Sequence, residues 1–439
     1  MQRLVWLWTV SLFIKLGLSG FLPLSPDEAY YWFWTKHLQL SYFDHPPFVA
    51  WLLTLGRGLE SFHSFVRAPA VIFLHLSFWV WYPLLRRFLN RDQIWDWALL
   101  WLLNPLTGVG SIIVTPDLAI LFFWPLACLT LLMTFETKSL SWAAGFGISL
   151  GFGFCAKYHM ALFGFIALTW VIWERRFTFK HFPALAISML FFVASSLPVW
   201  WWNWENDFIS FRFQIDHGLG SSQWKPFWTW SYLLGQALLI FPLVLWAATK
   251  NSRSRSVPFW VKFLAFGPLL FFLLSSFRGK VEANWPIVAY PFIFALAAIR
   301  FPKVAMRSVL TLWFAALLFL VVDGGFDFVP DQLSPSKIKE IRLIEFASRA
   351  TQSYRPLYTT SYQLAAKMSF ETKEDIYKLK GSGRVDFFDS LKKSLPEEGS
   401  FYFLTWRGDH LPELYRQNHI VEERIPIGDK LDLLKVVDL

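Results

Sequence analysis

Apolar stretches long enough to cross a lipid bilayer recur along most of this 439-residue chain. A membrane-spanning helix needs about 20 mostly apolar residues, with roughly 17–25 as the usual range. Such runs, some of them short or interrupted by proline, lie at residues 4–22, 67–85, 97–114, 118–135, 142–156, 159–173, 182–202, 230–248, 258–276, 285–299 and 307–322. The pattern predicts an all-α polytopic membrane domain over residues 1–330, with about 11 transmembrane helices.

The composition changes near Asp331, and residues 331–439 resemble a small soluble α/β domain. This segment holds 17 basic and 17 acidic residues, whereas the rest of the chain holds 24 and 15. The segments RPLYTTSY, GSFYFLTW and DKLDLLKVVD, at 355–362, 399–406 and 429–438, predict strands. Amphipathic helices are predicted within 334–350 and 410–418.

The overall composition excludes several classes of protein. The mean hydropathy is +0.39 and 20% of the residues are aromatic, which is too apolar for an ordinary soluble globule. The excess of nine positive charges lies in the apolar part, so it suits loops facing anionic lipid rather than a nucleic-acid footprint. Cys128 and Cys155 both lie in apolar runs, so neither a disulfide nor a cysteine metal motif is expected. Residues 1–22 have no small-residue cleavage site and are interpreted as a retained first helix.

The basic residues between the apolar runs predict the orientation in the membrane, because cytoplasmic loops carry more Lys and Arg. With a cytoplasmic N-terminus, the inner connections hold Arg86, Arg87, Arg91, Lys138, Arg175, Arg176, Lys180, Lys250, Arg253, Arg255, Arg300, Lys303 and Arg307. Most acidic residues of the membrane domain then fall outside, namely Asp27, Glu28, Asp44, Glu60, Asp117, Glu205, Asp207, Asp216 and Glu282. Carboxylate chemistry and the C-terminal domain are therefore expected on the non-cytoplasmic face.

The first outer loop carries two candidate catalytic groups. Ser25-Pro26 predicts a helix start that places Asp27 and Glu28 in the first turn, followed by an aromatic surface suited to the lipid interface. Asp44 and His45 precede a Pro-Pro pair that starts a further helix. The carboxylates could merely cap helices, or they could converge at the membrane surface, where one acts as a base.

Two further polar positions flank this loop in the predicted topology. Asp117 follows Thr-Pro at the outer mouth between two helices, where a short turn would also explain it. Lys157 and Tyr158 interrupt two apolar runs, and a lysine near mid-bilayer costs about 2.5–3.5 kcal/mol. Lys157 therefore either faces a polar cavity or extends to the outer headgroups.

A third outer segment, FRGKVEANWP, holds two cations at the bilayer surface. Arg278 and Lys280 could bind a lipid-linked phosphate, Glu282 could steady one of them, and Asn284 precedes the next helix. A simple interfacial anchor is the alternative.

Other catalytic signatures are missing from the sequence. It has no Walker motif, no GxGxxG after a strand, no HExxH and no GxSxG. His37, His45 and His63 do not have the spacing of a metal site, so a metal stays unassigned; a divalent cation could assist but nothing requires one.

The motifs in their order resemble the bacterial branch of the dolichyl-phosphate-mannose–protein mannosyltransferase superfamily. They are SPDEAYYWFW, YFDHPP, TPD, AKYHMAL and GKVEANWP, and they cover roughly residues 20–300. The set is similar to GT-C fold glycosyltransferases of the PMT type, including 4-amino-4-deoxy-L-arabinose transferases and lipopolysaccharide-core galacturonosyl transferases. The resemblance implies a polyprenyl-phosphate sugar donor, an inverting displacement at the outer surface of a bacterial inner membrane, and a glycolipid acceptor.

The resemblance also implies roles for the candidate residues. Asp27 would be the general base for the acceptor hydroxyl, while Asp44, and with it Asp117, would position the acceptor or the loop. Lys157, Arg278 and Lys280 would neutralise the departing phosphate. The arabinose transferases tend to have Glu-Lys where this chain has Asp44-His45, so the donor sugar and the phosphate contact of this loop stay open.

Three other interpretations of the function are compatible with the sequence. A protein acceptor would make the chain similar to a protein O-mannosyltransferase. A polytopic lipid transporter or flippase would also suit many helices, but the polar residues gather on one face and no repeat is present. An assembly or anchoring protein would leave the carboxylate-rich first loop unexplained.

Overall fold

The structure is a computed structural model that describes residues 1–174, 178–220, 223–396 and 399–439, with the backbone alone at 217–219. Arg175 and Arg176, assigned to an inner loop, lie outside the described residues. The chain forms two compact units. The helical unit comprises Met1–Phe21 and Gln39–Val321, and the C-terminal unit comprises Leu22–Leu38 and Val322–Leu439. The first outer helix thus belongs to the same compact unit as the C-terminal segment, a grouping that the sequence did not indicate.

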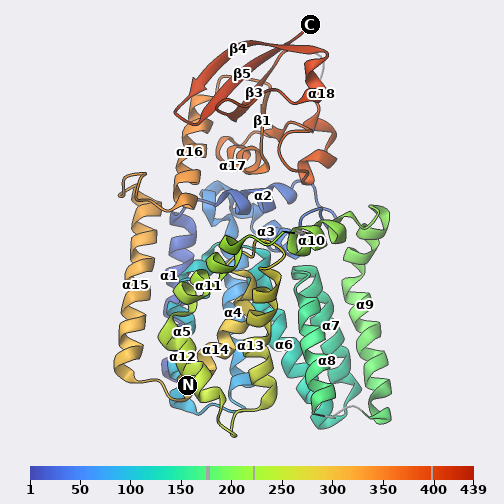
Figure 1. Ribbon diagram of the computed structural model, residues 1–439, viewed down its shortest axis with the longest axis vertical. Coiled ribbons are helices and arrows are strands. Elements are labelled where there is room, and N and C mark those ends of the chain that lie inside the picture. Colours follow the sequence, from blue (N-terminus) through green and yellow to red (C-terminus); the bar gives the residue numbers. More distant parts are fainter. Residues whose placement is uncertain (175–177, 221–222, 397–398) are drawn as a thin grey trace. The chain divides into compact units, whose positions relative to one another are not determined.

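The helical unit consists of helices joined by short loops (Figure 1). They are α1 (Gln2–Phe21), α3 (Phe48–Thr54), η1 (Arg57–Arg67), α4 (Ala68–Leu85), α5 (Arg91–Leu103), η2 (Val109–Ile112), α6 (Pro116–Thr137), α7 (Leu140–Ala156), α8 (Met160–Trp173), η3 (Phe179–His181), α9 (Phe182–Glu205), α10 (Ile209–Leu219), α11 (Pro226–Ile240), α12 (Pro242–Ser252), α13 (Phe259–Ser275), η4 (Trp285–Ala289), α14 (Tyr290–Ile299) and α15 (Lys303–Phe326), whose last residues belong to the C-terminal unit.

Most predicted runs are single helices, and a proline lies at the break in each of the three that are not. In the run 285–299, the 3-10 helix η4, with non-helical φ/ψ at Pro286, precedes α14. The run 97–114 is helical only to Leu103, because Asn104 precedes Pro105 and adopts an extended conformation. The run 230–248 breaks between α11 and α12 with a bend of 85°. There Phe241 has a φ of 72° and Pro242 supplies no N–H to continue the helix.

Close packing of α7 on α9 fixes the position of the α7 C-terminus. A Cβ at Gly147 would lie 2.2 Å from the carbonyl oxygen of Ser188, and one at Gly151 would lie 1.9 Å from Ser195 Oγ. Ser188 Oγ donates to the Ala143 carbonyl at 2.9 Å across the same interface. The two glycines, four residues apart, therefore allow the helix backbones to approach as small residues do in membrane bundles.

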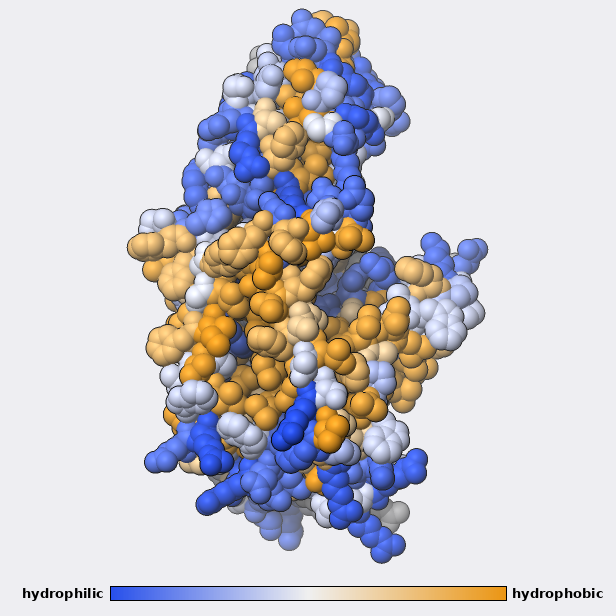
Figure 2. Space-filling view, turned by 90° about the vertical axis from the view of Figure 1, so that its left-hand side faces the viewer, coloured by the Kyte–Doolittle hydropathy of each residue, from blue (hydrophilic) through white to orange (hydrophobic). Residues whose placement is uncertain are grey.

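The helical unit has the surface expected of a membrane protein. Within the described residues, five helices are long and apolar enough to cross a membrane, or six if the bent α11–α12 pair is one span, and four shorter apolar helices accompany them. Exposed apolar side chains cover α15, for example Leu312, Phe314 and Leu318. Figure 2 shows a broad hydrophobic zone with hydrophilic residues below it, at the end of the unit where Figure 1 places the N-terminus. The total of about 11 spans stays a prediction.

The C-terminal unit is a five-stranded sheet covered by helices, as the α/β prediction requires. Its elements are α2 (Pro26–Trp34), α16 (Ser336–Ala350), β1 (Leu357–Thr359), α17 (Tyr362–Thr372), β2 (Tyr377–Lys378), η5 (Phe387–Ser390), η6 (Lys392–Ser394), β3 (Phe401–Trp406), α18 (Glu413–Arg416), β4 (His419–Ile427) and β5 (Leu431–Asp438). The strand order is β2-β1-β3-β5-β4, with β1 parallel to both neighbours and the β3–β5 and β5–β4 pairs antiparallel. Leu364 and Met368 of α17 pack with Leu404 of β3 in its core.

The aromatic residues of α2 are buried in protein, which corrects the prediction of an aromatic surface at the lipid interface. Tyr30, Trp32 and Phe33 are at most 2% exposed. The ring of Trp32 lies 5.0 Å from that of Phe370 in α17, and the ring of Phe33 lies 4.7 Å from that of Phe388 in η5. The helix that begins with Asp27 is therefore a core element of the C-terminal unit.

Candidate functional site

A buried ion pair joins two of the residues that the sequence selected. Asp117 lies in the first turn of α6, which starts at Pro116, and Lys157 lies at the C-terminal end of α7 with extended backbone. The Lys157 ammonium contacts the Asp117 carboxylate, and the two side chains are only 5% and 9% exposed. Lys157 therefore faces a polar site inside the protein and does not extend to the lipid headgroups.

Aromatic rings and imidazoles surround this pair. Lys157 Nζ lies 5.7 Å from the centre of the Trp285 ring, within cation–π range. The His159 ring lies 5.4 Å from Trp285 and 5.0 Å from Phe272. Lys157 and His45 both act electrostatically on His159, so the first-loop residue His45 belongs to the same neighbourhood. The site thus combines one buried ion pair with imidazole and aromatic rings.

His159 lies within the AKYHMAL motif and is a further candidate that the sequence alone did not indicate. Its Nδ1 is buried and has no hydrogen-bond partner among the described protein residues. A buried polar atom without a partner costs free energy unless a water molecule or ligand satisfies it. The position directly after Lys157-Tyr158, at the break between α7 and α8, could have indicated it.

Tyr158 and Asp44 both contact the segment around α9 and α10. The Tyr158 hydroxyl lies 2.9 Å from Ser210 Oγ in α10 and 3.5 Å from Asn203 Nδ2 in α9. The Asp44 carbonyl accepts a hydrogen bond of 2.5 Å from Gln214 Nε2 in α10, and Asp44 is 2% exposed. This tethering favours a positioning role for both residues.

The loop between α13 and η4 places its cations at the surface. Lys280 Nζ lies 2.8 Å from Glu282 Oε1, and both side chains are more than half exposed. Arg278 is exposed, and Asn284 precedes η4 without a side-chain cap bond. An exposed pair contributes little stability. Trp285, at the end of this loop, is the residue that reaches the buried ion pair.

Asp27 and Glu28 lie in the C-terminal unit and have different surroundings. Ser25 and Glu28 form a capping box: the Ser25 amide donates to Glu28 Oε2 at 2.9 Å and the Glu28 amide donates to Ser25 Oγ at 3.2 Å. Glu28 is fully buried, so its carboxylate serves the helix start. The Asp27 side chain is 36% exposed, accepts a hydrogen bond of 3.2 Å from the Tyr362 hydroxyl and lies 3.8 Å from Lys337 Nζ.

The other end of α2 is fixed by a second ion pair. Lys36 Nζ donates to Asp375 Oδ1 at 2.6 Å. Burial alone would raise the pKa of Asp375, but the hydrogen bond from Lys36 lowers it below its ordinary value. Burial also lowers the pKa of His37. Helix α2 is thus bound at both ends to the rest of the C-terminal unit.

Within the described ranges, no group of three or more His, Cys, Asp or Glu side chains is arranged to hold a metal ion. Cys128 and Cys155 are free and buried, as expected from their apolar runs.

Comparisons with known proteins support the resemblance to GT-C glycosyltransferases that the motifs indicated. Residues 44–202 match the family described as dolichyl-phosphate-mannose-protein mannosyltransferase. This range includes Asp44, His45, Asp117, Lys157 and Tyr158.

Particular relatives extend the resemblance over the whole chain. The chain is 24% identical over 415 residues to the lipid A galacturonosyltransferase RgtD of Rhizobium johnstonii, covering 86% of this chain and 85% of that protein. Crystal structures of ArnT from Cupriavidus metallidurans match with a TM-score of 0.68, covering 99% of this chain and 98% of theirs. The ArnT structure with bound undecaprenyl phosphate is 14% identical in sequence to this chain, and the structure of the apo state is 15% identical. The chain therefore has the ArnT fold.

Proposed function

We propose that this protein is an inverting glycosyltransferase that moves a sugar from a polyprenyl-phosphate donor to a hydroxyl of a lipid A or lipopolysaccharide-type glycolipid. The observation that carries the proposal is the buried Asp117–Lys157 pair beside His159 and Trp285. An aromatic-walled site that holds a lysine at the ends of membrane helices suits a lipid-linked phosphate sugar. The similarity to a lipid A galacturonosyltransferase supports the acceptor class.

The donor phosphate is the first group that the site must recognise. Undecaprenyl phosphate bound to an ArnT structure supports a polyprenyl-phosphate carrier for this chain. Lys157, with His45 near it, would bind the phosphate in the low-dielectric site, while the exposed Arg278 and Lys280 would attract it from the surface. A phosphate is an acceptable leaving group once its charge is neutralised, so no proton donor is needed for its departure.

The transfer step needs one base. The acceptor oxygen attacks the anomeric carbon, and the bond from this carbon to the phosphate oxygen breaks with its electron pair leaving on the phosphate. The hydroxyl proton passes to the Asp27 carboxylate. Asp27 suits this role because it is partly exposed and held by the Tyr362 hydroxyl. Asp44, Asp117, Tyr158 and Asn284 would position the loops and substrates, and Glu282 would orient Lys280.

The non-cytoplasmic, periplasmic face is the proposed place of the reaction. Its support is the distribution of Lys and Arg, which predicts cytoplasmic loops at the N-terminal end of the helical unit. A protein acceptor is the second candidate, since the matching family is described as a protein mannosyltransferase.

Mass spectrometry of envelope glycolipids tests the proposal. Cells that express the protein should contain a glycolipid carrying one additional sugar, and cells that lack it should contain only the unmodified species. Identical glycolipids in both, with a sugar missing from an envelope protein, would favour the protein acceptor.

A further inference from the structure

A groove in the helical unit lies between the bent helix pair α11–α12 and helix α13. Its volume is about 670 Å³. Both arms of the 85° bend line it, with Leu233 and Ile240 in α11 and Leu245 in α12, and one face of α13 forms the opposite wall. Leu233 and Leu270 are 40% and 56% exposed, so the groove is open to the surface of the helical unit. A hydrocarbon chain can therefore enter it from the side.

Tyr232 and Gln236 also line the groove, but the protein itself satisfies their polar atoms. The Tyr232 hydroxyl donates to the Leu269 carbonyl at 2.7 Å. Gln236 Nε2 donates to the Ala283 carbonyl at 2.9 Å, and Gln236 Oε1 accepts from the Tyr290 hydroxyl at 2.8 Å. The wall at this end of the groove is therefore apolar in effect and suits a hydrocarbon chain.

Lys262 places a cation at the opposite end of the groove, near the start of α13. Its Nζ lies 3.4 Å from the Ser254 carbonyl oxygen, and among the described residues no carboxylate is paired with it. The preceding segment 250–261 adds three basic residues and no acidic one, namely Lys250, Arg253 and Arg255. Figure 1 shows the α12–α13 connection at the same end of the helical unit as the N-terminus. This end of the groove therefore attracts an anion.

The length of the groove corresponds to one leaflet of a bilayer. Lys262 and Leu273 both line it and are 11 residues apart in α13, which is about 16 Å at a rise of 1.5 Å per residue. The hydrocarbon core of a bilayer is about 30 Å thick, so one leaflet contributes about 15 Å. A phosphate at Lys262 thus leaves room for one acyl chain along α13.

Lys262 is also well separated from the candidate site. The ring of Phe272 lies 5.0 Å from that of His159, and Phe272 is ten residues further along α13 than Lys262. A headgroup at Lys262 therefore lies about 15 Å along the helix from the level of the buried Lys157. The cation in the groove is thus separate from the cations assigned to the sugar donor.

We propose that this groove binds one anionic phospholipid of the membrane, with its phosphate at Lys262 and an acyl chain between α13 and the α11–α12 bend. The ligand is neither the sugar donor nor the acceptor. Basic pockets between membrane helices on the cytoplasmic side recognise lipid headgroups in this way. The bound lipid fills the space inside the bend.

Native mass spectrometry of the delipidated full-length protein in detergent tests the headgroup. The probes are dioleoyl phosphatidylglycerol, which is anionic, and dioleoyl phosphatidylcholine, which is zwitterionic. The unaltered protein should bind one phosphatidylglycerol in preference to phosphatidylcholine. Lys262→Gln should weaken phosphatidylglycerol binding about fivefold, the effect of one basic side chain at an anionic lipid, and leave phosphatidylcholine binding unchanged. Lys180→Gln, an exposed lysine in η3 outside the groove, is the matched control and should keep the preference.

A second pair of variants tests the acyl chain. Leu270→Trp fills the groove and should weaken the binding of both lipids. Leu312→Trp is the control, because Leu312 on α15 is 53% exposed and does not line the groove.

Four results would overturn the inference. The unaltered protein could show no preference for phosphatidylglycerol, Lys262→Gln could keep that preference, or Leu270→Trp could bind both lipids as Leu312→Trp does. Displacement of phosphatidylglycerol by undecaprenyl phosphate would be the fourth, because it would assign the groove to the polyprenyl carrier.

Discussion

Lys157 and Asp117 form an ion pair between the C-terminal end of α7 and the first turn of α6, almost fully enclosed by protein. Breaking a buried pair leaves one uncompensated charge, whereas removing both charges does not. Lys157→Met should therefore lower the free energy of unfolding by about 3–5 kcal/mol, measured by thermal or denaturant unfolding in detergent.

A double variant separates the structural from the functional role of this pair. Lys157→Met/Asp117→Leu should regain much of the stability, because neither charge is left alone, but should still not bind undecaprenyl phosphate. Lys303→Met, which removes a lysine that is 67% exposed and paired with Asp96, is the control and should keep donor binding. Normal donor binding by the stable double variant would contradict the phosphate role of Lys157.

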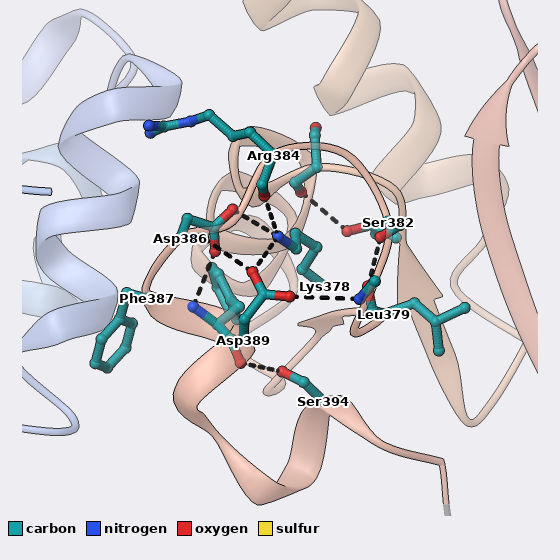
Figure 3. Close-up of polar contacts among 12 residues, drawn as sticks. Lys378, Leu379, Ser382, Arg384, Asp386, Phe387, Asp389 and Ser394 are labelled. Atoms are coloured by element: carbon teal, nitrogen blue, oxygen red, sulfur yellow. Dashed lines mark hydrogen bonds and ion pairs between the residues drawn. The ribbon is translucent and has the colours of Figure 1, made fainter. Parts of the chain in front are cut away.

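Lys378, Asp386 and Asp389 of the C-terminal unit form a buried cluster that should behave as a single unit (Figure 3). Lys378→Met leaves Asp386 and Asp389 buried without their cation, so the C-terminal unit should lose about 3–5 kcal/mol of stability. The triple variant with both aspartates changed to Asn should recover much of that loss. Hydrogen exchange in residues 379–389, followed by mass spectrometry, measures both effects, and Lys435→Met in an exposed pair should leave this exchange unchanged.

The antiparallel hairpin of β4 and β5 should lose stability at acidic pH, because Asp432 becomes protonated there. Burial alone would raise the pKa of Asp432, but the hydrogen bonds from Arg424 and the Gly408 amide lower it below the ordinary value of 3.8. A carboxyl with a lowered native pKa stabilises the fold fully above its unfolded pKa, and this contribution is lost as the pH falls through the native value.

Asp432→Asn should therefore reduce the stability of β4 and β5 at neutral pH and make it less dependent on pH below about 4. Amide hydrogen exchange in β4 and β5, corrected for the pH dependence of the intrinsic exchange rate, measures this local stability at each pH. Asp429→Asn, in the exposed turn of the same hairpin, is the control and should keep the native acid dependence. An unchanged acid profile in Asp432→Asn would show that another group is responsible.

The orientation in the membrane is tested by two conservative substitutions. Ser61 in η1 and Ser254 between α12 and α13 are both exposed, while the native cysteines are buried. Ser61→Cys should react with an impermeant thiol reagent applied to intact cells whose outer membrane has been made permeable. Ser254→Cys should react only after lysis. The reverse labelling pattern would place the N-terminus outside.

The sequence was sufficient for features encoded locally. Hydrophobic runs located most helices of the helical unit, and Ser25-Pro26 located the start of α2. Pro242 could have indicated the break after α11, but the apolar run around it continued without a change in composition. The strands β1, β3 and β5 lie in short apolar and aromatic runs and were predicted, whereas β2 has only two residues and β4 is largely exposed.

Features that depend on distant residues could not be predicted. The aromatic face of α2 looks like an interfacial surface until its partners are known, and these lie more than 300 positions away, as the Tyr30–Phe387 bond shows. For the same reason the sequence selected Asp27 but not Tyr362, whose hydroxyl donates to it. The sequence analysis also treated Asp27 and Glu28 alike, because only the structure shows that the Glu28 carboxylate takes part in the capping box.

The most direct test compares two aspartates at the same helical position. Asp27 is the second residue of α2 and Asp92 is the second residue of α5, and both helices begin with a capping box. Sugar transfer to envelope glycolipid is measured by mass spectrometry in membranes containing each Asp→Asn variant at equal protein level. Asp27→Asn should transfer at least about 100-fold more slowly, as expected for loss of a general base, with undecaprenyl phosphate binding retained. Asp92→Asn should transfer normally; equal, near-normal transfer by both variants would contradict the assignment of Asp27 as the base.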